Sequence, residues 1–404
     1  MQQNLMQQKS QKTIKVAFLA DGDAKDINLW SGTTSHIAKA LEKQQEIEIY
    51  YINHLFKEIN YATYLLRGVY SRILRLFGIQ YSSRFTLEFA KKLAKVIPQK
   101  LPKDTDVIFS IATQTSVAFL KSDAKKIMYT DGAWAGMIDY YPCFVNLYSK
   151  TAQELLIIEK NAFENCDLLL FSSDWAANSA INAYNLNPSK VKVIPIAPNM
   201  ERECSEVEIK NIIKKRRSDR CNLLFIGVDW ERKGGAIAVD IAKELHSQNI
   251  NVHLDIVGIK NIPLPLPDYI TNHGFINKKS EEGNKKLIQL FEESHFFVLP
   301  TQQECFGVAF AEASSFGVPS IATKTGGVET AVKDNINGMT FALSEPAKTY
   351  ADYIKTLFTN RQEYENLCLS AFNDYKNRLN WNVIGEQMRD AIISTAVTAD
   401  LYSH

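Results

Sequence analysis

The chain has 404 residues, of which 46% are hydrophobic, and it carries 46 basic against 45 acidic residues. This length exceeds a single ordinary core, so the composition predicts a globular protein of two domains. A formal charge of +1 gives no overall electrostatic reason to expect nucleic acid as a partner. Residues 1–15 contain no apolar stretch of signal-peptide length, and nowhere do about 18 consecutive apolar residues occur, so we expect a cytoplasmic protein.

The six cysteines are scattered along the chain. They form no CxxC pair and have no histidine neighbours at the spacing of metal ligands. We therefore expect small buried thiols rather than disulfides or structural zinc.

Short apolar runs alternate with longer amphipathic stretches, which is the pattern of βα units and a parallel sheet. Residues 14–20 (IKVAFLA) and 47–52 (IEIYYI) are predicted strands, and residues 35–43 between them are a predicted helix. Further strands are expected at DVIFSI, KIMYT, LLLFS and VKVIPI, each separated from the next by enough chain for a crossover helix.

A polar, charged stretch at 205–220 (SEVEIKNIIKKRRSDR) interrupts this series and is predicted to be a linker. After it the alternation restarts with LLFIG, VHLDIVG, FFVLP and PSIAT as strands, and with helices near 236–246, near 285–293 and after Gly307. The sequence thus predicts two doubly wound, Rossmann-like α/β domains, each with a parallel sheet, that face each other across a cleft.

The predicted domain boundaries follow from this division. The N-terminal domain is expected to span 1–204 and the C-terminal domain 221–380, with the linker between them. Residues 381–404 begin with WNVIGEQMRDAII and are expected to form a C-terminal helix that packs back toward the N-terminal domain.

Two carboxylates follow the predicted strand FFVLP: Glu304 in a polar loop and Glu312 in the next helix. If that helix begins near residue 306 or 307, Glu312 lies roughly 8 Å further along it, a distance comparable with a diphosphate. The amides of Phe306, Gly307 and Val308 at the helix N-terminus could hold a phosphate. Glu304 would then lie toward a sugar, and Glu312 toward a ribose with two vicinal hydroxyls.

The segment ECFGVAFAEASSFGVPSIATKTGGVETAV, with its two glutamates separated by seven residues, resembles the donor-site signature of the family-4 retaining glycosyltransferases (glycosyl transferases group 1, GT-B fold). The resemblance implies transfer of a sugar from a nucleoside diphosphate sugar to an acceptor hydroxyl with retention of configuration, in cell-surface glycan or glycolipid assembly. The spacing alone would also fit two solvated glutamates in an ordinary βα unit. The other matching positions are Gly307, Ala313, Gly317, Pro319, Gly326, Gly327, Glu329, Asn337 and Gly338.

The turn after the first strand of the second domain, GVDWERKGG, carries Arg232 and Lys233 before a helix. Charge-assisted hydrogen bonds from such groups contribute about 1.5–3 kcal/mol each to holding a diphosphate. Lys233 occupies the family's lysine position, whereas Val228 stands where the family has an arginine that Arg232 could replace. We expect no metal to be required, because the basic pair and the helix terminus supply positive charge and neither predicted cleft loop has a DxD motif. A solvated turn is the alternative.

The first domain offers two weaker candidates. Gly32 precedes a predicted helix and resembles the glycine of the family's first loop, which approaches the donor; a simple helix cap is the alternative. Asp131, in MYTDGAWAG, lies where many family members have a histidine near the transferred sugar. It could orient a sugar hydroxyl or stabilise positive charge at the anomeric carbon, or merely cap the next turn.

Residues 61–103 form a basic segment with nine Lys or Arg residues and one acid, Glu88. Because YLLRGVYSRILRLFG interleaves the charges with apolar residues, we weigh peripheral contact with the inner face of a membrane against an ordinary surface helix. The nine basic residues of this segment are Arg67, Arg72, Arg75, Arg84, Lys91, Lys92, Lys95, Lys100 and Lys103.

For the sugar transfer that the resemblance implies, the expected acceptors are glycans, glycolipids or proteins.

Two rival functions fit the same resemblance. A nucleotide-sugar epimerase of GT-B architecture would release a free altered sugar and need no acceptor. The other is a transferase-like binding subunit without activity. It is favoured because Val228 and Asp131 differ from the residues that the family usually has at these positions.

Overall fold

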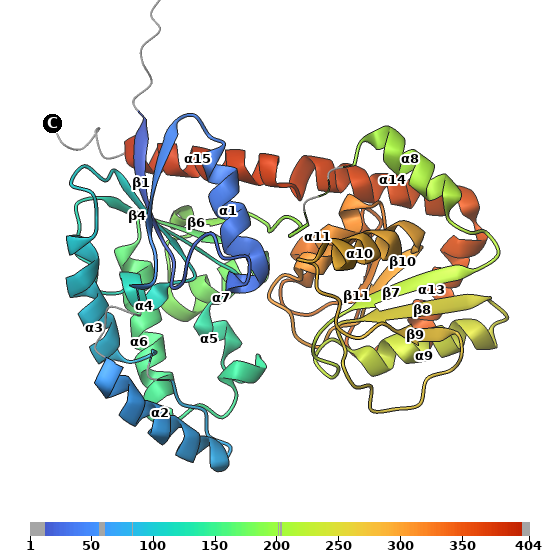
Figure 1. The fold of residues 1–404 in the computed structure, drawn as a ribbon, viewed down its shortest axis with the longest axis horizontal. Coiled ribbons are helices and arrows are strands. Elements are labelled where there is room, and N and C mark those ends of the chain that lie inside the picture. The colour runs from blue at the N-terminus through green and yellow to red at the C-terminus, as the bar shows by residue number, and fades with distance from the viewer. Residues whose placement is uncertain (1–12, 56–60, 83, 201, 203, 398–404) are drawn as a thin grey trace, which may run out of the picture. The chain divides into compact units, whose positions relative to one another are not determined.

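The computed structural model describes residues 13–55, 61–82, 84–200, 202 and 204–397. The chain divides into two compact units, each of which is described by itself. The first unit comprises residues 1–172, 176–194 and 381–404, and the second comprises residues 173–175 and 195–380. Figure 1 shows both and labels many of their helices and strands.

The first unit is built on a parallel sheet with strand order β2-β1-β3-β4-β5-β6. Strand β1 lies between β2 and β3, so that its Leu19 is opposite both Ile52 and Ser110. The chain therefore turns to opposite sides of β1, which makes this edge a topological switch point. The strands are β1 (Ile14–Leu19), β2 (Ile47–Ile52), β3 (Val107–Ile111), β4 (Lys125–Thr130), β5 (Leu168–Phe171) and β6 (Val191–Val193).

Helices of the first unit fall into two groups (Figure 1): α1 packs with α15, and α6 packs with α3, α4 and α5. Because helices cover the sheet, all five residues of the inner strand β3 are buried, whereas the edge strands β2 and β6 are partly exposed. The helices are α1 (Thr33–Glu42), α2 (Tyr61–Leu76), α3 (Leu87–Val96), α4 (Gln114–Val117), α5 (Trp134–Met137), α6 (Ser149–Asn165), α7 (Asp174–Tyr184) and α15 (Trp381–Val397), with 3-10 turns η1 (Leu29–Gly32), η3 (Ile97–Gln99), η4 (Pro142–Phe144) and η5 (Pro188–Lys190).

The second unit repeats the plan with strand order β12-β11-β10-β7-β8-β9. Strand β7 pairs with β10 on one side and β8 on the other, so the switch point lies between the ends of β7 and β10. The strands are β7 (Cys221–Ile226), β8 (Val252–Val257), β9 (Ile270–Asn272), β10 (Phe296–Leu299), β11 (Ser320–Thr323) and β12 (Gly338–Phe341).

Helices α9 and α13 pack together in the second unit, while α14 packs with α8 and α11 (Figure 1). The helices are α8 (Glu206–Lys215), α9 (Gly235–Ser247), α10 (Glu281–Glu293), α11 (Val308–Ser315), α12 (Val328–Ala331), α13 (Ala347–Thr359) and α14 (Arg361–Arg378). The predicted fold class, two doubly wound parallel-sheet α/β domains, is confirmed.

The predicted linker, 205–220, is part of the second unit. It contains α8, which starts with a capping box between Ser205 and Glu208 and buries Ile209 and Ile213. Arg216, also expected in a linker, is buried and donates to the carbonyl oxygens of residues 316 and 317, both at 2.8 Å. Most residues of α8 are charged or polar, so the sequence pattern does not reveal that one face of the helix is apolar.

Helix α15 belongs to the first unit, although the chain reaches it from the second. The Trp381 and His36 rings stack with their centroids 5.6 Å apart. Gly385 lies against α1, where a Cβ atom would be 3.1 Å from the Ala40 carbonyl oxygen. The first unit is thus completed by a helix that follows the second unit in the sequence.

No disulfide joins the six cysteines, and four of them are buried. Among the helices that the structure describes, none is long and apolar enough to cross a membrane.

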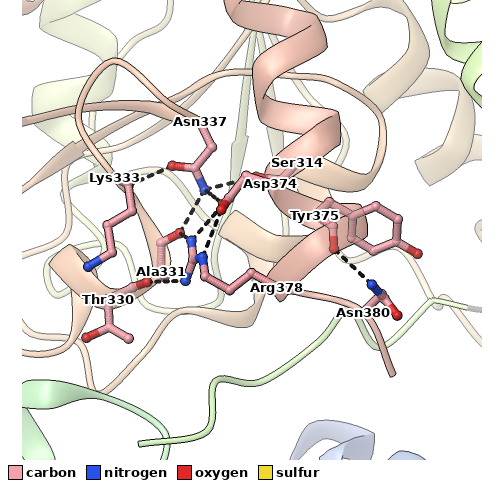
Figure 2. A network of polar contacts seen from close by, with 9 residues as sticks. All are labelled: Ser314, Thr330, Ala331, Lys333, Asn337, Asp374, Tyr375, Arg378 and Asn380. Atoms are coloured by element: carbon pink, nitrogen blue, oxygen red, sulfur yellow. Dashed lines mark hydrogen bonds and ion pairs between the residues drawn. The ribbon is translucent and has the colours of Figure 1, made fainter. Parts of the chain in front are cut away.

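Asn337 is the centre of a buried polar network in the second unit (Figure 2). Its side-chain oxygen accepts a hydrogen bond from the Lys333 backbone N–H at 2.6 Å. Its nitrogen donates to the Ala331 carbonyl oxygen at 2.9 Å and to Asp374 Oδ2 at 3.0 Å. Arg378 pairs with the same carboxylate at 2.7 Å. The network therefore ties the end of α12 and the turn before β12 to α14.

We expect Asn337→Ala to lower the free energy of unfolding by about 2–4 kcal/mol, because several buried partners lose their hydrogen bonds at once. Urea denaturation followed by circular dichroism measures this. Asn366→Ala is the matched control, because Asn366 is exposed on α14 and should change stability by less than about 0.5 kcal/mol. Equal effects of the two substitutions would contradict the role given to the network.

Candidate functional site

Two loops meet at the switch point of the second unit: residues 227–234 after β7 and residues 300–307 after β10. The Arg232 carbonyl oxygen accepts hydrogen bonds from the Gln302 N–H at 2.7 Å and from Thr301 Oγ1 at 3.0 Å. Gly234 has a φ of 73°, and a Cβ atom there would lie 2.0 Å from the Pro300 carbonyl oxygen. Only glycine permits this close approach, so the loops are held in a fixed register.

A charged cluster joins the two loops. Lys233 Nζ forms a salt bridge with Glu304 Oε2, and Arg232 Nη1 lies 3.8 Å from the same oxygen. The Arg232, Lys233 and Glu304 side chains are only 13%, 14% and 8% exposed. Asp229, which pairs with Arg232, adds a second carboxylate, so the cluster as a whole is formally neutral. The structure thus brings together three residues that the sequence analysis selected separately.

Asp229 and Trp230 orient the basic pair. Asp229 Oδ1 accepts from the Arg232 N–H at 3.0 Å, and its Oδ2 lies 3.6 Å from Arg232 Nε. The Trp230 ring lies where a Cβ atom on Gly235 would be, which fixes the start of α9. Val228, where the family has an arginine, is 72% exposed and contributes no charge.

The Glu304 loop is supported from behind by the Gly326–Gly327 turn. The Gly327 N–H donates to the Glu304 carbonyl oxygen at 2.9 Å, and a Cβ atom on Gly327 would lie 1.8 Å from the Cys305 carbonyl oxygen. Thr325 Oγ1 donates to the Gln302 carbonyl oxygen at 3.0 Å. The sequence analysis placed Gly327 in the family pattern without a role, and its role is this backbone contact.

Helix α11 begins at Val308, slightly later than expected, with Gly307 as its N-cap at a φ of 85°. A Cβ atom on Gly307 would lie 2.6 Å from the Phe310 ring, so glycine is required here. Phe306 is buried. Glu312 therefore lies four residues into the helix, about 6 Å along its axis. That the amides of residues 306–308 hold a phosphate stays a prediction.

Glu312 is nearly buried and has a basic neighbour that the sequence analysis missed. Lys278 Nζ, from the segment between β9 and α10, lies 3.7 Å from Glu312 Oε1. Nothing in the sequence pairs these positions, because Lys278 lies in a loop without periodicity. Within the part of the chain that the structure describes, no three His, Cys, Asp or Glu side chains lie together as metal ligands would.

In the first unit, Trp30 connects the two candidates that the sequence suggested. Its Nε1 donates to Asp131 Oδ2 at 3.1 Å. Trp30, Ser31 and Gly32 have φ values of 49°, 57° and 95°, so three left-handed residues precede α1. Left-handed conformation in the two non-glycine residues costs free energy and persists only where the surroundings enforce it. The Gly32 loop is thus held against the end of β4, which carries Asp131.

Glu159, a buried carboxylate on α6, fixes the turn that follows Asp131. It accepts hydrogen bonds from the Trp134 N–H at 2.6 Å, the Ala135 N–H at 2.9 Å and the Tyr184 hydroxyl at 2.8 Å. Burial raises the pKa of Glu159 to about 7 despite these donors. The sequence analysis missed it, although a glutamate between Ile158 and the following apolar residues of one helix face is a detectable signal.

The raised pKa of Glu159 gives a pH prediction. The unfolded chain releases this proton near the ordinary pKa of about 4.5 and the folded protein near 7, so the carboxyl contributes stability below pH 4.5 that is lost as the pH rises to 7. Glu159→Gln stays neutral. We therefore expect the unfolding free energy of the variant, relative to wild type, to rise by about 3 kcal/mol from pH 4.5 to 7.5.

Urea denaturation at a series of pH values measures this difference. Glu164→Gln, at an exposed position of α6, controls for the substitution itself. Parallel stability curves for wild type and Glu159→Gln would show that the group does not titrate in this range.

Comparison with known proteins finds a family model that matches part of the chain. Residues 207–373 match the model of the family described as glycosyl transferases group 1. The matched segment contains Arg232, Lys233, Glu304 and Glu312.

Among curated proteins, the chain is similar to an uncharacterized 41.2 kDa protein in the cps region of Klebsiella pneumoniae, with 20% identity over 53% of this chain and 56% of that protein. It is 22% identical to a D-inositol 3-phosphate glycosyltransferase of a Nocardioides species, over 58% of this chain and 55% of that protein. The chain thus spans little more than half the length of these relatives.

Among solved structures, a glycosyltransferase from Rickettsia africae matches with a TM-score of 0.63 and 14% identity, over 97% of this chain and all of that one. The Anabaena protein HepE in complex with UDP matches with a TM-score of 0.62 and 16% identity, over 94% of this chain and all of that one. Residues 207–373 of the second unit are thus similar to the glycosyl transferases group 1 family, and the chain has the GT-B fold.

Proposed function

We propose that the chain transfers a sugar from a nucleoside diphosphate sugar to an acceptor hydroxyl, with retention of anomeric configuration. The observation that carries the proposal is the buried cluster of Arg232, Lys233 and Glu304 at the switch point of the second sheet. The similarity in fold to HepE, whose structures contain UDP and UDP-glucose, supports a nucleotide-sugar donor.

Stabilisation of the leaving diphosphate is the chief chemical task. As the bond between the anomeric carbon and the phosphate oxygen breaks, its electron pair passes to the diphosphate. The acceptor oxygen bonds to the anomeric carbon, and its proton passes to the departing phosphate oxygen. Asp229 and Glu304 already orient Arg232 and Lys233. The two basic side chains can therefore stabilise the negative charge on the departing diphosphate without moving. The proposal requires no metal and no cofactor, because these two side chains supply the positive charge.

The two glutamates have different tasks in the proposal. Glu304 binds hydroxyls of the transferred sugar beside the diphosphate, and Glu312 accepts hydrogen bonds from the vicinal hydroxyls of the ribose. Lys278 neutralises Glu312 in the absence of a nucleotide. Backbone amides of Phe306, Gly307 and Val308 hold a phosphate at the N-terminus of α11.

The first unit supplies the remaining groups. Asp131, held by Trp30, orients a sugar hydroxyl or stabilises positive charge at the anomeric carbon. Gly32 allows close approach of the donor. The acceptor is a glycan, a glycolipid or a protein, and the enzyme acts in the cytoplasm in the assembly of cell-surface glycans. The similarity in fold to WaaG, a glycosyltransferase involved in lipopolysaccharide biosynthesis, supports this setting.

Lys233→Met tests the proposed contact between Lys233 and the diphosphate of the donor. We expect the variant to bind nucleoside diphosphates at least about tenfold more weakly, because one charge-assisted contact of about 1.5–3 kcal/mol is lost. Isothermal titration calorimetry with UDP, GDP, ADP and CDP measures the affinities. Lys243→Met is the control, because Lys243 is exposed on the adjoining helix α9 and pairs only across the surface with Asp240.

Donor turnover separates the proposal from its rivals. Free altered sugar formed from the donor alone would indicate an epimerase. Nucleotide binding that Glu304→Ala leaves unchanged, without turnover of any donor and acceptor pair, would indicate a binding subunit. If no nucleotide or nucleotide sugar raises the melting temperature, the proposal fails.

Glu312→Gln tests the ribose contact with the nucleotide that binds best. We expect the variant to lose about tenfold in affinity for the ribonucleotide, because hydrogen bonds to a carboxylate are replaced by weaker ones. Wild type and variant should bind the 2′,3′-dideoxy nucleotide equally, since it offers no hydroxyl to Glu312. An equal loss for both nucleotides would place Glu312 away from the ribose.

A further inference from the structure

Exposed hydrophobic side chains gather on one segment of the first unit. Five of the 13 large hydrophobic side chains that are exposed among the described residues lie within residues 69–77. Single exposed hydrophobics are normal on a protein surface, whereas a cluster indicates a binding surface. The five are Val69, Tyr70, Ile73, Leu76 and Phe77.

Four of these side chains form the outer face of α2. Val69, Ile73 and Leu76 recur at the spacing of one helix face, and Phe77 extends it directly after the helix. Leu76 and Phe77 are the most exposed, at 85% and 75%. The peripheral position of α2 in the first unit is visible in Figure 1.

Tyr70 and Ser71, at other positions of α2, already have partners. The Tyr70 ring meets the rings of Tyr81 and Tyr148 edge to face, with centroids 5.3 and 6.3 Å apart. Ser71 Oγ donates to the Tyr81 carbonyl oxygen at 3.1 Å. Because these contacts fix the rotation of the helix, the apolar face cannot turn inward without breaking them.

The basic residues around this apolar face indicate what kind of surface it binds. Arg72 and Arg75 are exposed on the same helix, and Arg72 adjoins the apolar face. The neighbouring helix α3 is different: it buries Phe89 and Leu93 and turns its lysines to solvent. Of the basic segment 61–103, the part around α2 therefore combines charge with apolar exposure, as helices at anionic membrane surfaces do.

We infer that the outer face of α2 docks on an anionic membrane surface, with Leu76 and Phe77 inserted among the lipids and Arg72 and Arg75 at the headgroups. The inference rests on the proposed function only for the use of this surface, which is to hold the enzyme where lipid-linked acceptors lie. Vesicle binding requires no turnover, so the two proposals can fail independently.

Co-sedimentation of the full chain with vesicles tests the inference. Wild type should bind vesicles of phosphatidylglycerol and phosphatidylcholine at low salt. Leu76→Ser with Phe77→Ser should weaken binding at least about tenfold, because two inserted side chains are lost. Arg72→Gln with Arg75→Gln should weaken binding to anionic vesicles by about fivefold for each arginine and flatten its dependence on salt.

Phe275→Ser with Leu343→Ser is the matched control, since both positions are exposed hydrophobics of the second unit, and it should bind like wild type. Unchanged thermal unfolding of each variant shows that its fold is intact. The inference is overturned if wild type does not bind anionic vesicles, or if Leu76→Ser with Phe77→Ser binds them as wild type does. It is also overturned if that variant only converts a dimer into a monomer, because the face would then join two copies.

Discussion

The salt bridge between Lys233 and Glu304, reinforced by Arg232, is the interaction on which the rest of the second unit depends. It joins two loops that are 71 residues apart in the sequence. A buried carboxylate is stable only beside positive charge, and two buried cations so close together would repel each other without it. Each side chain therefore holds the others in place, and the cations are oriented before any ligand arrives.

Close backbone packing makes this arrangement rigid. Gly234 and Gly327 lie against carbonyl oxygens of the Glu304 loop, one on each side, at distances that a side chain would prevent. The second of these contacts continues into α12, whose end is tied to α14 by Asn337 and Arg378. The charged cluster thus rests on the framework of the whole unit rather than on two flexible loops. Preorganised charge of this kind is what stabilisation of a leaving group requires.

Sequence reasoning predicts most readily those residues of the candidate site that follow buried strands. Lys233 and Glu304 come after β7 and β10, whose apolar runs are easy to recognise, and parallel strands bring such loops to one edge. Lys278 and Trp30 lie in irregular segments, so no periodicity points to their partners. Glu159 accepts hydrogen bonds from residues 24 and 25 positions away, which only the folded chain brings near.

The structure differs from the predicted linker at 205–220 for a related reason. Helix α8 is short and rich in charge, and its two buried isoleucines do not stand out among polar residues. Arg216 stands in a run of basic residues, and since arginine is rarely buried, nothing in the local sequence predicts its burial. Its partners are backbone carbonyl oxygens at the end of α11, a region 100 residues further along the chain. The sequence around Arg216 therefore does not predict these partners.

The return of α15 to the first unit has a consequence for how the protein is made. Ribosomal synthesis releases the sheet of the first unit early, but the helix that packs on α1 emerges only after the second unit. Until then the first unit presents the uncovered apolar side of α1 to the cell, while the second unit can already fold. The nascent chain therefore completes its domains in the reverse of their order of synthesis, and a chaperone has longest access to the half that was made first.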